Sequence, residues 1–192
     1  MRGATSTLVL TLLVAACGAV PSQAGRGGSA AQAVTPAPPL EGIRAGGGEF
    51  TLAALRGEPV VLVFYRGVFC GLCQQRLRQL ETHRKAYERL GARVVAVTLD
   101  DPELAETTRD ELELDLTIVS AEPDVFAAWG VWAEGERWPR PGEFVLDAEG
   151  RVRFAHVGLN ASDSVSDVVL QGALAALGNV APPPATARGE AP

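Results

Sequence analysis

The chain has 192 residues, of which 47% are hydrophobic, and its formal net charge is −6 at pH 7. This length suits one domain with appendages, and the hydrophobic content is enough for a buried core. Because the sequence is acidic and contains no basic stripe, we predict no nucleic-acid partner.

The first residues read as an export signal. Met1 and Arg2 precede an apolar run at residues 8–16, which is too short for a comfortable transmembrane helix. The stretch VAACG at residues 14–18 resembles the lipobox of bacterial lipoproteins, in which the peptide is cut before the cysteine and lipid is attached to its sulfur. The resemblance implies a signal peptide at residues 1–16, a lipid on Cys17, and a domain anchored on the extracytoplasmic side of a bacterial cell envelope. The alternative is an ordinary secretory signal with an incidental cysteine.

Two segments have the composition of flexible chain. Residues 17–41 are rich in Ser, Gln, Gly, Ala and Pro and contain few large apolar residues. Such a segment cannot bury enough surface to offset its ordering entropy, so we predict a tether there. Residues 179–192 include three consecutive prolines and predict a disordered tail. The folded domain is therefore expected at residues 42–178.

The remaining elements are organised around residues 60–73. The continuous apolar run VVLVF at residues 60–64 predicts a buried strand. Cys70 and Cys73 follow in a Cys-x-x-Cys spacing, and a segment without proline or glycine then extends to residue 90. We predict a strand, a tight loop, and a helix over residues 71–90 whose first turn carries both sulfurs. The helix N-terminus favours the thiolate form of Cys70, which suits thiol redox chemistry.

Strands and helices alternate through the rest of the domain. Within the first helix, Arg76 and Arg84 interrupt an apolar stripe, so we expect them to snorkel or to border the site. Strands are predicted at residues 93–99, 116–119, 143–147 and 151–156, and helices at residues 102–115 and 123–129. Asp101 is the expected N-cap of the first of these helices, and Ser162 that of a last helix reaching residue 177.

Residues 50–73 resemble the start of the thioredoxin-like redoxin superfamily, and specifically peroxiredoxin-like proteins of the alkyl-hydroperoxide-reductase and thiol-specific-antioxidant type. The resemblance rests on the extended stretch FTL, the stretch LRGEP at residues 55–59, the apolar strand, and the short loop before Cys70. It implies an α/β, thioredoxin-like fold with a central mixed sheet flanked by helices. It also implies that Cys70 is the attacking sulfur and Cys73 the resolving one.

Metal binding is the alternative use for the cysteines. A structural zinc site usually needs four ligands, and besides this pair the domain offers only His83 and His156. Copper chaperones that resemble this fold use a longer cysteine spacing and place their histidine before the penultimate strand, whereas His156 falls in the last predicted strand. We therefore predict no metal and no cofactor beyond a redox-active disulfide.

Pro141 is the second element of the predicted site. In thioredoxin-like proteins a cis-proline faces the cysteine pair, just before a strand similar to FVLD at residues 144–147. Pro141 has this spacing, and the backbone before it could hold an extended substrate. The alternative is that both Pro139 and Pro141 are ordinary trans loop prolines. Among the aromatic residues, only Trp138 is expected near the site.

The choice between two reactions depends on residues that the chain lacks. The peroxiredoxins that this chain resembles typically carry a Pro-x-x-x-Thr-x-x-Cys pattern around the reactive cysteine, together with a distant arginine. The threonine position corresponds to Gly67 and the arginine position to Pro141. Arg66 and Arg140 are candidates for the missing positive charge, although either could be a solvated loop residue.

From the residues we predict an exported, membrane-tethered thiol–disulfide oxidoreductase. We expect this protein to exchange disulfides faster than it reduces peroxides. The alternative is a peroxiredoxin-like thiol peroxidase with Cys70 peroxidatic and Cys73 resolving; a non-catalytic thioredoxin-fold module or a copper-binding module is a further alternative. The expected partners are an exported protein, a small thiol or disulfide, or a peroxide, together with a thiol electron donor and the lipid anchor.

Overall fold

A computed structural model describes residues 35–132 and 135–178. The predicted signal peptide, Cys17, most of the tether, and the tail at residues 179–192 lie outside the described residues. The described chain forms an eight-stranded sheet in the order β1-β8-β7-β4-β5-β6-β2-β3. The strands are β1 (Thr35–Pro36), β2 (Glu41–Arg44), β3 (Glu49–Thr51), β4 (Val60–Phe64), β5 (Arg93–Thr98), β6 (Thr117–Ser120), β7 (Gly142–Leu146) and β8 (Arg151–Val157).

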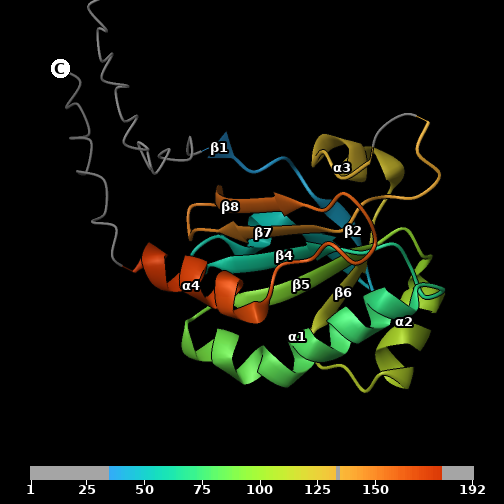
Figure 1. The fold of residues 1–192 in the computed structure, drawn as a ribbon, viewed down its shortest axis with the longest axis horizontal. Coiled ribbons are helices and arrows are strands. Elements are labelled where there is room, and N and C mark those ends of the chain that lie inside the picture. The colour runs from blue at the N-terminus through green and yellow to red at the C-terminus, as the bar shows by residue number, and fades with distance from the viewer. Residues whose placement is uncertain (1–34, 133–134, 179–192) are drawn as a thin grey trace, which may run out of the picture. The chain divides into compact units, whose positions relative to one another are not determined.

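Helices cover both faces of the sheet (Figure 1). The helical elements are the 3₁₀ turn η1 (Leu52–Leu55), α1 (Gly71–Arg89), α2 (Pro102–Glu111), α3 (Pro123–Ala128) and α4 (Asp167–Leu177). Figure 1 shows α1 and α4 on one face and α3 on the other. The mixed sheet between helices confirms the predicted α/β architecture.

Strand β4 is the most enclosed part of the sheet. All five of its residues are buried, as the apolar run predicts. It pairs in parallel with β5 and antiparallel with β7, so that Phe64 lies beside Val97 on one side and Gly142 on the other. A strand paired on both edges and covered on both faces has to be apolar throughout.

The alternating side chains of β4 divide the core into two clusters. Val61 and Val63 pack with Leu77, Leu80 and other residues of α1, as well as with residues of α4. Leu62 and Phe64 enter the opposite cluster, where Phe64 contacts the rings of Phe126, Trp129 and Phe144. Successive side chains of a strand point to opposite faces, which explains the division.

The fold begins earlier than predicted. Residues 35–41 were expected in the tether, but β1 pairs with β8, and Leu40 is only 1% exposed in the core. The amide of Leu52 donates to the carbonyl of Leu40, which ties this segment to the first hairpin. One large apolar residue and an edge pairing are thus enough to order a segment whose composition is that of a linker.

Two helix boundaries also differ from the prediction. The helix expected to reach residue 115 ends at Glu111, and Glu113 adopts a positive φ of 51°. The last helix begins after Ser166 and not after Ser162, because the hydroxyl and amide of Ser162 both bond to the side chain of Asn160 in a preceding turn. Ser, Asn and Asp side chains compete for such local bonds, so a capping residue type alone does not locate a helix start.

Arg76 is buried, and it is paired inside the protein. Its Nε lies 2.9 Å from Oε1 of Glu143 on β7, and its Nη1 lies 2.9 Å from Oδ2 of Asp167 on α4. The amide of Val165 donates to the other Glu143 oxygen at 2.7 Å. Glu143 is 1% exposed, and burial raises the pKa of its carboxyl. The expectation that Arg76 snorkels or borders the site is therefore wrong; its charge joins three elements through two carboxylates.

Arg84 behaves differently. It is half-buried and forms ion pairs with Glu81, Glu88 and Asp115, which link α1 to the segment before β6. Leu90, just beyond the end of α1, is 39% exposed.

We expect Arg76→Gln to destabilise the domain strongly. The substitution leaves two carboxylates buried without their cation, which typically costs about 3–5 kcal/mol. The loss should shrink as the pH falls, because Glu143, whose folded-state pKa is raised, takes up a proton and loses its charge. Urea unfolding at about pH 7 and about pH 5 measures both effects.

Arg78→Gln is the matched control, since Arg78 is exposed on the same helix and should change the unfolding free energy by less than about 0.5 kcal/mol. Equal losses in the two variants would contradict the assignment, as would a loss for Arg76→Gln that does not depend on pH.

Candidate functional site

The two cysteines lie at the start of α1 and form a disulfide. Cys70 is the N-cap of the helix, and its sulfur accepts a hydrogen bond from the amide of Cys73 at 3.3 Å. The Cα atoms are 5.2 Å apart. Cys70 is 8% exposed and Cys73 is 6% exposed. The strand, loop and helix therefore place both sulfurs as predicted, at a helix end whose free amides stabilise a negative charge.

Polar contacts on both sides hold the loop before Cys70 in place. The amide of Cys70 donates to the carbonyl of Gly67 at 3.1 Å, which makes a tight turn. The side chain of Gln74, one turn into α1, donates to the carbonyl of Val68 at 2.7 Å. The loop is thus attached to the helix that it precedes, which restricts the position of the Cys70 sulfur.

The side chain of Asp100 holds the loop before Cys70 through hydrogen bonds. Its Oδ2 accepts the amide of Val68 at 2.8 Å and the hydroxyl of Thr98 at 3.0 Å. Burial is the main cause that raises the pKa of this carboxyl. The sequence analysis missed Asp100, although its place directly after β5 was a signal. The carboxyl ends of neighbouring parallel strands meet at one edge of a sheet, so a residue just past β5 lies beside the loop that follows β4.

Gly67 has no room for a side chain. Its φ is +135°, and a Cβ atom there would lie 2.7 Å from Oδ1 of Asp100 and 3.0 Å from the ring of Phe69. A threonine, the residue expected at this position by resemblance, would overlap the carboxylate. Asp100 therefore occupies the space that a hydroxyl-bearing side chain would need.

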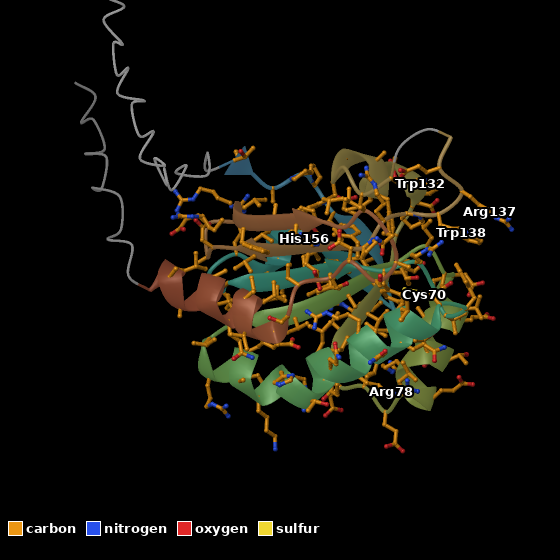
Figure 2. All side chains as sticks on the ribbon, in the orientation of Figure 1. Cys70, Arg78, Trp132, Arg137, Trp138 and His156 are labelled. Carbon is orange, nitrogen blue, oxygen red and sulfur yellow. A yellow bond between two sulfur atoms is a disulfide. The ribbon has the colours of Figure 1, made fainter. Side chains whose placement is uncertain are left out.

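Three other predicted site residues meet at one pocket. Arg66, Arg140 and Pro141 line a cavity of about 340 Å³ together with Trp138. The ring of Trp138 packs on that of Phe69, with centroids 4.4 Å apart, so the pocket adjoins the residue directly before Cys70. Figure 2 shows Trp138 and Arg137 at the same end of the sheet as Cys70. The placement of Trp138 near the site agrees with the prediction.

Pro141 is correctly placed, but it is not a cis-proline. It directly precedes β7, yet the described residues contain no cis peptide bond. The prediction of a cis bond is therefore wrong. The carbonyl of Pro141 accepts the amide of Gly158 at 2.8 Å, so the backbone here is engaged with the segment after β8 and is not free for a substrate chain at that atom.

Each of the two histidines contacts an aspartate and neither forms a described contact with the cysteines. Nε2 of His156 is 3.1 Å from Oδ1 of Asp163, and Nδ1 of His83 is 3.5 Å from Oδ2 of Asp167. Within the described residues, no group of three or more His, Cys, Asp and Glu side chains could hold a metal ion. The described geometry thus offers no support for the copper or zinc alternative.

We expect Gly67→Thr to destabilise the loop and not to supply a usable hydroxyl. A non-glycine residue at this φ costs on the order of 1–3 kcal/mol, and the side chain must also displace Asp100. Thermal unfolding of the oxidised protein measures the loss. Gly71→Ala is the matched control, because no atom lies within 4 Å of a Cβ placed there. Equal stability of Gly67→Thr and wild type would show that the loop can rearrange around Asp100.

Comparison with known proteins places this geometry in a family. The model of the AhpC/TSA family matches residues 34–155. Alkyl hydroperoxide reductase E of Mycobacterium tuberculosis is 30% identical over 111 residues, which is 56% of this chain and 72% of that protein.

Solved structures share the fold. The peroxidoxin BcpB of Mycobacterium tuberculosis superposes with a TM-score of 0.65 at 22% identity, covering 78% of this chain and 97% of that one. AhpC of Enterococcus faecalis superposes with a TM-score of 0.67 at 15% identity, covering 75% and 91% of the two chains. These likenesses confirm the thioredoxin-like fold expected from the sequence. With the family model matching most of the chain and a disulfide-linked Cys70 and Cys73 at the start of α1, the protein belongs to the AhpC/TSA family of peroxiredoxin-like, thiol-dependent oxidoreductases.

Proposed function

We propose that this protein is a thiol peroxidase in which Cys70 reduces a hydroperoxide and Cys73 resolves the oxidised product. The observation that carries the proposal is the disulfide between the N-cap sulfur of α1 and the sulfur one turn later, in a chain of the AhpC/TSA family. The disulfide is the expected product of the second step. No bound cofactor takes part in this scheme.

The reaction has two steps on the protein. The Cys70 thiolate attacks the terminal OH oxygen of the hydroperoxide, an S–O bond forms and the O–O bond breaks, so that Cys70 becomes a sulfenic acid. The alkoxide leaves and takes up a proton from solvent to become an alcohol. The Cys73 thiol then attacks the Cys70 sulfur, which forms the disulfide and releases water. A thiol donor must supply two electrons to restore both thiols.

The groups that would stabilise the charges in this site differ from those expected by resemblance. Gly67 and Pro141 stand where a threonine and an arginine were expected, and neither supplies a donor. The amide of Cys73 already points at the Cys70 sulfur, at 3.3 Å, and the N-terminus of α1 favours a thiolate there. Arg66, on the same loop, is the nearest cation in sequence and would supply the positive charge.

A thiol–disulfide oxidoreductase is the second candidate. The specific observation in its favour is that Gly67 cannot carry a side chain, so the expected hydroxyl has no equivalent at that position. The family and the relatives weigh toward the peroxidase, which reverses the order of preference drawn from the residues alone.

Export and lipid anchoring at Cys17 remain a proposal from the sequence. Its support is the apolar run followed by VAACG. Among residues 35–132 and 135–178, no helix is both long and apolar enough to cross a membrane.

Single cysteine substitutions should separate the two chemical steps. Reduced Cys70→Ser should lose rapid hydrogen peroxide consumption, because the attacking thiolate is gone. Reduced Cys73→Ser should consume one peroxide per chain and gain one oxygen atom in mass without forming the intramolecular disulfide, because the resolving sulfur is missing. Stopped-flow mixing followed by intact-mass analysis reads out both results.

The same experiment decides between the candidate reactions. Equal peroxide consumption by wild type and Cys70→Ser would contradict the role of Cys70. A wild-type rate no faster than that of an ordinary thiolate, together with mixed disulfides trapped on Cys73→Ser in cells, would instead support the thiol–disulfide oxidoreductase.

Lipid attachment is tested on the full-length chain expressed in a bacterium. The mature wild-type protein should begin at Cys17, carry acyl groups by intact mass, and sediment with membranes. Cys17→Ser should abolish acylation and release the domain from the membrane fraction. A soluble wild-type product that begins well past Cys17 would contradict the proposal.

A further inference from the structure

The pocket that adjoins Phe69 carries a positive charge that the described residues do not neutralise. Arg66, Arg137 and Arg140 line it with a single carboxylate, Glu136, although the whole chain has a net charge of −6. Arg66 forms no hydrogen bond or ion pair with any other part of the chain that the structure describes, and its Nε is fully buried. Arg140 Nε and Arg76 Nη2 are also buried without a hydrogen-bond acceptor, but both of those side chains have an ion pair, whereas Arg66 has none within the described residues. A buried guanidinium nitrogen with neither kind of partner is costly, which points to a ligand that supplies an acceptor to Arg66.

Arg140 is held in place by the protein itself. Its Nε lies 3.5 Å from Oε1 of Glu136, and its Nη2 donates to the carbonyl of Gly130 at 3.4 Å. Its backbone amide also donates to the carbonyl of Val131 at 2.7 Å. Arg140 therefore forms one wall of the pocket. Arg137 is exposed, and its guanidinium lies over the ring of Trp138, 5.4 Å from the centroid. Arg66 is therefore the part-buried arginine of the pocket for which the described residues provide no hydrogen-bond or ion-pair partner.

Apart from Asn160, the rest of the pocket is apolar and open. Trp138 is 38% exposed and Leu159 is 82% exposed, and Phe69 beside them is 55% exposed. Pro141 closes the wall next to β7. The volume of about 340 Å³ is at the small end of the range for small-molecule sites, which span roughly 300–1,000 Å³. A ligand of a few carbon atoms with one anionic group matches this combination.

We propose that this pocket binds the carboxylate of a small organic thiol, which is the electron donor that reduces the Cys70–Cys73 disulfide. The inference rests on the proposed function and adds the chemical class of the donor. The structure shows the oxidised state, and in this state the pocket adjoins Phe69 through Trp138, and Arg66 has no ion pair within the described residues. The partner that meets the oxidised protein is a thiol and not a peroxide. Guanidinium groups bind carboxylates through paired hydrogen bonds, which would orient the donor sulfur toward the disulfide.

The electrons balance in two exchanges. The donor thiolate attacks the Cys70 sulfur, a new S–S bond forms, and Cys73 leaves as a thiolate that takes up a proton. A second donor thiolate attacks the donor sulfur of this mixed disulfide, which releases the donor disulfide, and Cys70 leaves as a thiolate. Two thiols are oxidised to one disulfide, and the protein regains both cysteines in reduced form.

The test compares donors that differ in charge. Oxidised protein is mixed with 3-mercaptopropionate, which carries a carboxylate, with 2-mercaptoethanol, which is neutral, and with cysteamine, which is cationic. Acid quenching, alkylation and mass analysis give the rate constant for reduction, expressed per thiolate. The readout is the ratio of the anionic to the neutral rate constant, because a general effect on cysteine reactivity cancels in it.

The ratio should exceed one for wild type and fall by roughly tenfold in Arg66→Gln, because the charged hydrogen-bond donor for the carboxylate is lost; a tenfold change corresponds to about 1.4 kcal/mol. Arg66→Lys should keep part of the preference by retaining the charge. Cysteamine should be disfavoured in wild type. Arg78→Gln is the matched control: Arg78 is exposed on α1 and points away from Trp138 (Figure 2), so its removal should leave the ratio unchanged.

A second arm distinguishes donor from oxidant. Reduced protein is mixed with a hydroperoxide that carries a carboxylate and with tert-butyl hydroperoxide, which is neutral. If Arg66→Gln alters only this hydroperoxide ratio, the pocket serves the peroxide and the donor assignment is overturned. The same conclusion follows if wild type and Arg66→Gln show equal thiol ratios while the neutral thiol still reduces the disulfide. If no thiol reduces the oxidised protein, the thiol-dependent cycle itself fails and this assignment fails with it.

Discussion

The burial of β4 between β5 and β7 is the constraint on which the site depends. Because β4 is paired on both edges, the loop that follows it can only leave the sheet at one point, directly into α1. The parallel partner β5 ends beside that loop and delivers Asp100, while the antiparallel partner β7 begins there and delivers Pro141. Three strands that are distant in sequence thus surround Cys70 without any of them being part of the Cys-x-x-Cys motif. The local sequence determines where the cysteines lie, whereas the order of the strands in the sheet determines which other residues surround them.

Gly67 and Asp100 have to be considered as one unit. A carboxylate that accepts the amide of Val68 also fills the volume that a side chain at position 67 would occupy. The loop is therefore supported by a buried acid from the next strand and not by a hydroxyl within itself. This arrangement keeps the position of Cys70 fixed, as redox chemistry at a single sulfur requires. It also leaves the site without the threonine hydroxyl that could donate a hydrogen bond to a bound hydroperoxide. In the reaction proposed for this chain, the N-terminus of α1 and the nearby Arg66 would supply the missing stabilisation of negative charge.

Two arginines of this domain have opposite surroundings. Arg76 lies beneath the sheet face with Glu143 and Asp167, so its charge is cancelled and it joins α1, β7 and α4. Arg66 lies on the loop before Cys70 and forms no ion pair with a carboxylate of the described residues, although Glu136 lines the same pocket. A paired, buried arginine contributes to stability and specificity of packing, whereas an unpaired one beside a pocket is available to a ligand.

The sequence alone was sufficient for β4, for the cysteine-bearing helix, for most of the later strands and helices, and for the α/β class, because apolar runs, helix periodicity and punctuating glycines act over short distances. It also predicted Arg66, Arg140, Pro141 and Trp138 near the site, and the structure brings these four residues to one pocket. Local signals were misleading where a distant contact decided the outcome: Leu40 joins the core despite its linker-like surroundings, and Ser162 bonds to Asn160 while Ser166 caps the last helix. Only the tertiary structure placed Asp100 against Gly67, paired Arg76 with two acids, left Arg66 unpaired and showed that Pro141 is trans. Each of these results depends on how strands far apart in the chain are brought into register, and a single sequence does not contain that information in any local pattern.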